Sequence, residues 1–120
     1  GNVAEDLRKS NLPGLEGTAA RLEAALGDAV GTTHFLQTMV KEGKADVALA
    51  GATPYQRLFA LAAGGAYLAK GALAGGDAGR IALFRYFADN TLSETAALRD
   101  QVENGAPSLL DGADAALAAA

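Results

Sequence analysis

The sequence lacks cysteine and tryptophan and holds one methionine and one histidine. Without cysteine, disulfides, thiolate metal sites and a cysteine nucleophile are excluded. The single histidine, His34, has no carboxylate three or four residues away on the same helical face. It therefore provides no set of ligands for a transition metal, and we expect no metal-binding residues.

A surplus of basic charge is also missing. The 10 Lys and Arg and the 14 Asp and Glu are interspersed, and the formal net charge is −4. Without a basic stripe we expect neither nucleic acid nor an anionic membrane surface as a partner. The longest apolar run, Leu58 to Ala69, is shorter than the roughly 20 residues of a spanning helix, so we expect no membrane span. The lack of cysteine and of a signal peptide favours a cytoplasmic protein.

What the chain does have is apolar residues, which make up 50% of the sequence. They recur three and four positions apart in three segments, which predicts main helices at about 14–42, 46–74 and 78–104 of a single domain, 1–120. In the first, Asn11 is a candidate N-cap, Pro13 suits the first turn, and Gly43 suits the end. The buried positions expected there are Leu15, Ala19, Leu22, Leu26, Ala29, Thr33, Leu36 and Val40.

The second helical segment contains Pro54, which favours a short piece, Asp46 to Ala52, followed by a main helix from Pro54. This helix is apolar on most sides, so we expect it to be the most buried. The adjacent Gly64 and Gly65 leave almost no side chain there, which predicts a close helix crossing.

The third segment follows a Gly75-Gly76 turn, with Asp77 as a candidate N-cap. Gly105 and Pro107 are expected to end it, and a short last helix is expected from Ser108. The expected buried stripe is Ile81, Phe84, Ala88, Thr91, Thr95, Leu98 and Val102. Since no segment alternates like a strand and the turns are short, the predicted fold is all-α: an antiparallel helical bundle of three long helices with a short fourth.

Residues for catalysis are not evident. The acidic residues Glu5, Asp6, Glu94, Asp100 and Glu103 fall on polar faces, where nothing separates their pKa values as paired catalytic acids require. The 15 glycines form neither a dinucleotide fingerprint nor a P-loop. We therefore assign no catalytic, cofactor-binding or metal residue.

The aromatic residues form two clusters, around Tyr55 and Phe59 and around Phe84 and Phe87. Core packing explains most of them, but tyrosine, phenylalanine and arginine are also favoured at contact centres. We take Arg85 and Tyr86 to point away from the core. The candidate interface residues are Tyr55, Arg57, Arg85 and Tyr86.

Two stretches carry a family resemblance. The first is Gly51-Ala-Thr-Pro-Tyr-Gln-Arg-Leu-Phe-Ala-Leu-Ala-Ala-Gly-Gly-Ala-Tyr-Leu-Ala-Lys, and the second is Arg80-Ile-Ala-Leu-Phe-Arg-Tyr-Phe-Ala-Asp-Asn. Both resemble the C-terminal helical extension of acyl-CoA dehydrogenases of the methylthiopropionyl-CoA dehydrogenase-like subgroup. The resemblance covers most of Leu12 to Gly105, with specific motifs in about a third of it.

The resemblance implies a parent enzyme that uses FAD to desaturate an acyl-CoA between its α and β carbons. The cofactor would lie in the parent and not in this fragment, which would be a structural, accessory domain. Its partners would be the remainder of the subunit and, in a homo-oligomer, further copies. A start at Gly1, with Met39 as the only methionine, agrees with a fragment of a larger flavoenzyme.

Two alternatives remain open. The chain could be a stand-alone helical interaction or dimerisation module. It could also be a histidine phosphotransfer bundle that uses His34, although Gln37 and Thr38 stand where that family has lysine and glycine.

Overall fold

The computed structural model describes residues 2–10 and 12–119, without the side chains of Asp114 and Ala119. These residues form helices and turns, with no strand among them, so the predicted all-α helical bundle is confirmed. The helices are α1 (Val3–Ser10), α2 (Thr18–Lys41), α3 (Ala45–Ala50), α4 (Ala52–Gly75), α5 (Ala78–Asn90), α6 (Glu94–Asp100), a π-helical turn (Gln101–Gly105) and α7 (Ala106–Ala119).

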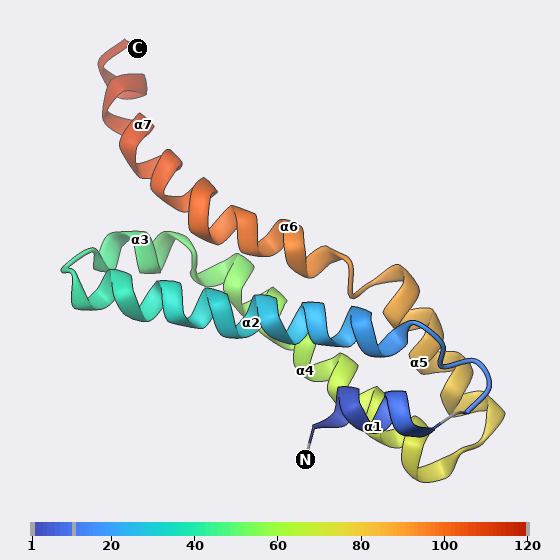
Figure 1. Ribbon diagram of the computed structural model, residues 1–120. Helices are drawn as coiled ribbons and strands as arrows, with labels where there is room; N and C mark the ends of the chain where they lie inside the picture. The colour runs from blue at the N-terminus through green and yellow to red at the C-terminus, as the bar shows by residue number, and fades with distance from the viewer. Residues whose placement is uncertain (1, 11, 120) are drawn as a thin grey trace.

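The core lies where α2, α4 and the α5–α6 segment meet (Figure 1). The largest enclosed side chains include Leu22 of α2, Leu58 of α4, Phe84 of α5 and Val102 of the π-helical turn. The predicted third stripe is largely confirmed, because Phe84, Ala88, Thr95, Leu98 and Val102 are buried and Ile81 and Thr91 are half-buried. In the first stripe, Val40 is exposed, because it lines an open hollow beside the end of α2.

The start of the first long helix was wrongly predicted. Pro13 lies in a turn and α2 begins at Thr18, because Gly14 and Gly17 adopt positive φ values of 91° and 77° that a helix does not contain. The candidate cap Asn11 lies outside the described residues. Gly43, with φ 78°, ends the helix as predicted, and Lys44 N–H donates to Met39 O at 2.7 Å.

Helix α1 was missed altogether. Its Val3, Ala4 and Leu7 are buried against α2 and α4, and Asn2 Oδ1 accepts from Ala4 N–H at 3.0 Å. The segment is only eight residues long, too short for a persistent apolar period, but its cap and charge order are typical of a helix: acids in the first turn and bases in the last.

The second segment divides as expected into a short and a long helix. The division falls at Gly51, so α4 begins two residues before Pro54, which occupies its first turn. The prediction that this is the most buried helix was wrong, because α2, of equal length, has six buried residues against five in α4, where Phe59 and Tyr67 are exposed. α4 is also long and apolar enough to span a bilayer by length and composition, contrary to our expectation from the run Leu58 to Ala69, although core helices of soluble proteins meet the same criteria.

The third segment begins as predicted. Gly76 adopts φ 64°, and Asp77 caps α5 by accepting from Arg80 N–H at 2.9 Å. It then breaks after Asn90, where Asn, Thr and Ser are poor helix formers, and the turn brings Leu92 into the core.

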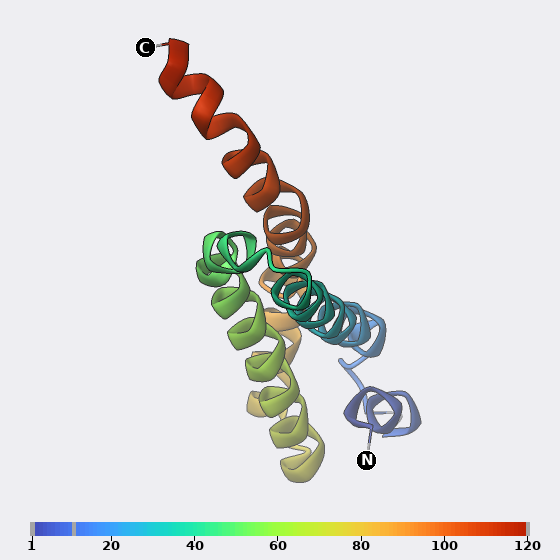
Figure 2. The same cartoon turned by 90° about the vertical axis from the view of Figure 1, so that its left-hand side faces the viewer.

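Gly105 and Pro107 do not end the third helix. Proline removes a helical N–H and its ring clashes with the carbonyl four residues earlier. The π-helical turn relieves this conflict, because Ala106 N–H bonds Gln101 O, five residues back. The chain therefore continues directly into α7, which projects beyond α3 (Figures 1 and 2).

Candidate interaction surfaces

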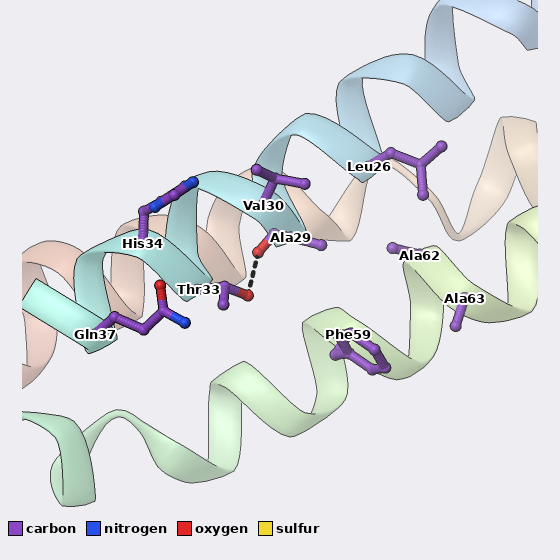
Figure 3. A pocket seen from close by; sticks show the side chains of 9 residues that line it. All are labelled: Leu26, Ala29, Val30, Thr33, His34, Gln37, Phe59, Ala62 and Ala63. Carbon is purple, nitrogen blue, oxygen red and sulfur yellow. Dashed lines mark hydrogen bonds between the residues drawn. The ribbon is translucent and has the colours of Figure 1, made fainter. Parts of the chain in front are cut away.

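A groove of about 400 Å³ runs between α2 and α4. Figure 3 shows Thr33 and Gln37 of α2 across from Phe59 of α4. The walls are mainly aliphatic and aromatic, and the residues that line the groove are Leu26, Ala29, Val30, Thr33, His34, Gln37, Phe59, Ala62 and Ala63.

The groove continues into a second hollow toward the end of α2, since Thr33 and Gln37 line both. The second hollow adds Leu36, Val40, Lys41 and Tyr55. We call the two together the α2–α4 groove. Two of its lining residues, Thr33 of α2 and Tyr55 of α4, are joined by a hydrogen bond of 2.7 Å between their hydroxyls.

His34, the residue of the phosphotransfer alternative, is exposed on α2 at the rim of this groove. Figure 3 places its imidazole along the edge of α2, whereas the Gln37 side chain extends toward α4. Neighbouring Gln37 and Thr38 carry no positive charge that would stabilise a phosphate. The surroundings of His34 thus add no support for phosphotransfer.

A second apolar surface lies between α4 and α5. Tyr67 and Leu83 line a hollow of about 480 Å³ there, together with Lys70 and Arg80. Tyr86, one helical turn after Leu83, is also exposed. We call Tyr67, Leu83 and Tyr86 the α4–α5 patch. Tyrosines flanked by cationic side chains are typical of protein contact surfaces.

The four predicted interface residues are not brought together. Tyr86 is exposed as predicted and belongs to the α4–α5 patch, whereas Tyr55 is half-buried in the α2–α4 groove. Arg57 pairs with Glu94 of α6 at 2.8 Å. Arg85 was expected to point outward, but its side chain is half-buried and forms hydrogen bonds within the domain.

Arg85 ties α5 to the turn that precedes α2. Its guanidinium donates to Gly14 O at 2.7 Å and to Asp89 at 2.8 Å, and lies 3.4 Å from Glu16. The bond to Asp89 raises the pKa of Arg85. The pKa of Glu16 is lowered, first by its own backbone N–H and then by Gly14 N–H and Arg85.

A polar network between α2 and α6 was missed by sequence reasoning. Asp28 accepts from the buried Thr95 hydroxyl at 2.9 Å and lies 3.5 Å from Arg99, which also donates to Glu103 at 3.1 Å. The spacing of Arg99 and Glu103, four residues apart, is a signal of a helical ion pair. Nothing in the sequence indicated that Asp28 lies beside them.

The acidic residues do not gather into a catalytic or metal site. Glu94 is paired with Arg57 and Glu103 with Arg99, and Glu5 and Asp100 lie on exposed surface. In the described ranges, no three His, Cys, Asp or Glu side chains are close enough to hold a metal ion.

The lining of the α2–α4 groove does not fit FAD. A dinucleotide diphosphate is held by backbone N–H groups of a glycine-rich turn or by basic side chains. The groove offers aliphatic and aromatic walls along two helices, and Lys41 is its one lysine or arginine. We therefore assign no flavin contact to these residues.

Comparison with protein families identifies one match. The family model described as acetyl-CoA dehydrogenase C-terminal like matches residues 1–112. Comparison with the curated proteins found no match, and comparison with the solved structures found none. The family match extends across α1 to α6, the π-helical turn and the first half of α7. This chain belongs to the acetyl-CoA dehydrogenase C-terminal-like family.

Proposed function

We propose that this chain is the C-terminal accessory domain of an FAD-dependent acyl-CoA dehydrogenase of the methylthiopropionyl-CoA dehydrogenase-like subgroup. The family match carries the proposal. The parent enzyme would desaturate an acyl-CoA in the cytoplasm, with flavin and catalytic base in the remainder of the subunit. The cofactor supplies the redox chemistry in such enzymes, while the protein positions the reactants.

The domain docks on the remainder of the subunit through the α4–α5 patch. Tyr67 and Tyr86 are 77% and 68% exposed, and with the exposed Leu83 they form a patch of the kind that marks protein contact sites. Their rings are rigid and amphipathic, and such residues supply much of the binding energy at contact centres. Lys70, on the same surface, favours an acidic counterpart, whereas Arg80 pairs with Asp77 of its own chain.

The flavin content of two proteins tests the assignment. The full coding sequence that contains this chain is expressed and purified beside residues 1–120 alone, and the flavin absorbance of each is measured. We expect one flavin per full-length subunit and none on residues 1–120. Stoichiometric flavin on residues 1–120 would overturn the assignment of roles, and a flavin-free full-length protein would favour the stand-alone interaction module.

Docking is tested in the full-length protein by Tyr67→Asp with Tyr86→Asp. If the patch is a contact, this variant splits a single thermal unfolding transition into two and makes the domain easier to cleave from the remainder of the subunit by limited proteolysis. Leu49→Asp is the matched control, because Leu49 is also 77% exposed but lies on α3. Equal unfolding of both variants would contradict docking through the patch.

A further inference from the structure

The α2–α4 groove and helix α7 form a complementary pair of unfilled apolar surfaces. Thirteen residues line the groove, nine in the first hollow and six in the second with two shared. Along α2 they extend from Leu26 to Lys41, a length of about 22 Å at 1.5 Å per residue. The exposed side chains of Val30 and Phe59 border it.

Helix α7 has matching dimensions. Its 14 residues measure about 21 Å. Leu109 and Leu117 are 65% and 75% exposed, and with Ala113 between them they form an apolar stripe on one side of the helix. Two exposed leucines on a projecting helix make an amphipathic segment of the kind that binds hydrophobic grooves.

Helix α7 does not lie in the α2–α4 groove of its own chain. Near its start α7 packs on α3, and it then runs away from the bundle (Figures 1 and 2). The groove lies between α2 and α4 and not beside this path. A helix that fills it therefore comes from another molecule.

The charges of the groove and of α7 are also complementary. Lys41 is the one lysine, arginine or carboxylate residue that lines the groove. The sequence of α7 contains aspartates, of which Asp111 is exposed, and neither lysine nor arginine. An acidic helix and a groove with a basic end attract each other, which favours this pairing over random apolar contact.

We propose that this chain forms a two-fold dimer in which α7 of each copy lies in the α2–α4 groove of the other. A two-fold axis makes the exchange reciprocal, so each copy contributes one groove and one helix. Thirteen groove residues and half of the 14 residues of α7 approach the roughly 20–30 residues a side of a stable interface. The proposal does not rest on the docking of the α4–α5 patch.

Sedimentation equilibrium of residues 1–120 tests the dimer, with two variants that alter exposed side chains. The helix variant is Leu109→Asp with Leu117→Asp, and the groove variant is Val30→Asp with Phe59→Asp. We expect each to raise the dimer Kd on the order of a hundredfold, about tenfold per substitution. Leu49→Asp is the control, because Leu49 is exposed on α3 and does not line the groove, so this variant should leave the Kd unchanged. Circular dichroism checks that each variant remains helical.

Mixing the two variants gives the decisive readout. A groove variant with an intact α7 and a helix variant with an intact groove can form one of the two contacts, so the mixture should associate more strongly than either variant alone. A wild-type chain that stays monomeric would overturn the dimer. Loss of the dimer in the helix variant only would also overturn the proposal, because it would show that α7 pairs with itself. An unchanged Kd in the helix variant would exclude α7.

Discussion

At the scale of single residues, Gly64 and Gly65 are adjacent but not equivalent. A Cβ built on Gly65 would lie 2.9 Å from Leu92 Cδ2 and 3.3 Å from Leu22 Cδ1, both in the core. A Cβ on Gly64 would meet only Phe87 Cζ, at 3.8 Å. The predicted close crossing is therefore confirmed, and it depends mainly on Gly65.

This difference predicts that substitutions at Gly64 and Gly65 have opposite effects on the free energy of unfolding. Gly65→Leu should lower the free energy of unfolding by about 1–3 kcal/mol, because the core is overpacked. Gly64→Ala should raise it by up to about 1 kcal/mol, because alanine favours the helix and the new methyl group has room. Urea unfolding followed by circular dichroism measures both, and equal stability of the two variants would refute the assigned crossing.

The two buried threonines Thr32 and Thr95 also predict opposite effects of the same substitution. Thr32 Oγ1 is buried without a hydrogen-bond partner among the described residues, whereas Thr95 Oγ1 donates to Asp28. Thr32→Val should stabilise the protein by about 1 kcal/mol, since it removes an unpaired polar group of the same shape. Thr95→Val should destabilise it by about 1.5–3 kcal/mol. Thermal unfolding of the two variants tests the contrast, and a loss of stability in Thr32→Val would show that its hydroxyl is paired.

At the scale of helices, Gly31 of α2 leaves room for the Arg99 guanidinium of α6. A Cβ at Gly31 would collide with the Arg99 guanidinium, which pairs with Asp28, whereas nothing lies within 4 Å of a Cβ at Gly27. Gly31→Ala should displace the Arg99 guanidinium from Asp28 and so weaken the contact of α6 with α2, whereas Gly27→Ala should stabilise α2 by up to about 1 kcal/mol. Hydrogen exchange should show faster opening of residues 94–105 in Gly31→Ala only. Unchanged exchange there would mean that Arg99 moves aside at no cost.

The docking of α1 should depend on pH. Arg8 forms a bidentate pair with Glu23 of α2, and this bond lowers the pKa of Glu23. A carboxylate with a lowered folded-state pKa stabilises the fold above its unfolded pKa, near 4.3, and loses that contribution as pH falls through the lower folded value. The effect should be small because both side chains are exposed.

Glu23→Gln tests this dependence. The variant should unfold at nearly the wild-type temperature at acidic pH and slightly below it at neutral pH, so the two curves should converge as pH falls. Thermal unfolding between pH 3 and 7 measures the difference. A constant difference across this range would contradict a role for the Glu23 charge.

Sequence reasoning succeeded for the helices with long periodic stripes and clear caps, such as Asp77 at α5 and Gly43 after α2. It failed where backbone geometry decided the outcome. Gly14 and Gly17 moved the start of α2, and the π-helical turn carried the chain past Pro107. The grooves were not predictable because they depend on which apolar faces the neighbouring helices leave uncovered.

At the scale of the whole molecule, the domain is elongated. Its radius of gyration is 17.6 Å and its extents are 58 × 29 × 16 Å, whereas a compact chain of this length has a radius of about 13–14 Å. Such a thin molecule leaves apolar side chains such as Phe59, Tyr67 and Leu117 on its surface. This shape agrees with the proposed role as a domain that docks on the remainder of a larger subunit.

The most direct test of the central claim is the size and flavin content of the natural protein, captured from its own cells with an antibody raised against residues 1–120. The account predicts a polypeptide several times longer than 120 residues, with the chain at its C-terminal end and bound FAD. A flavin-free polypeptide of about 120 residues would contradict it and show that the domain acts as an independent module.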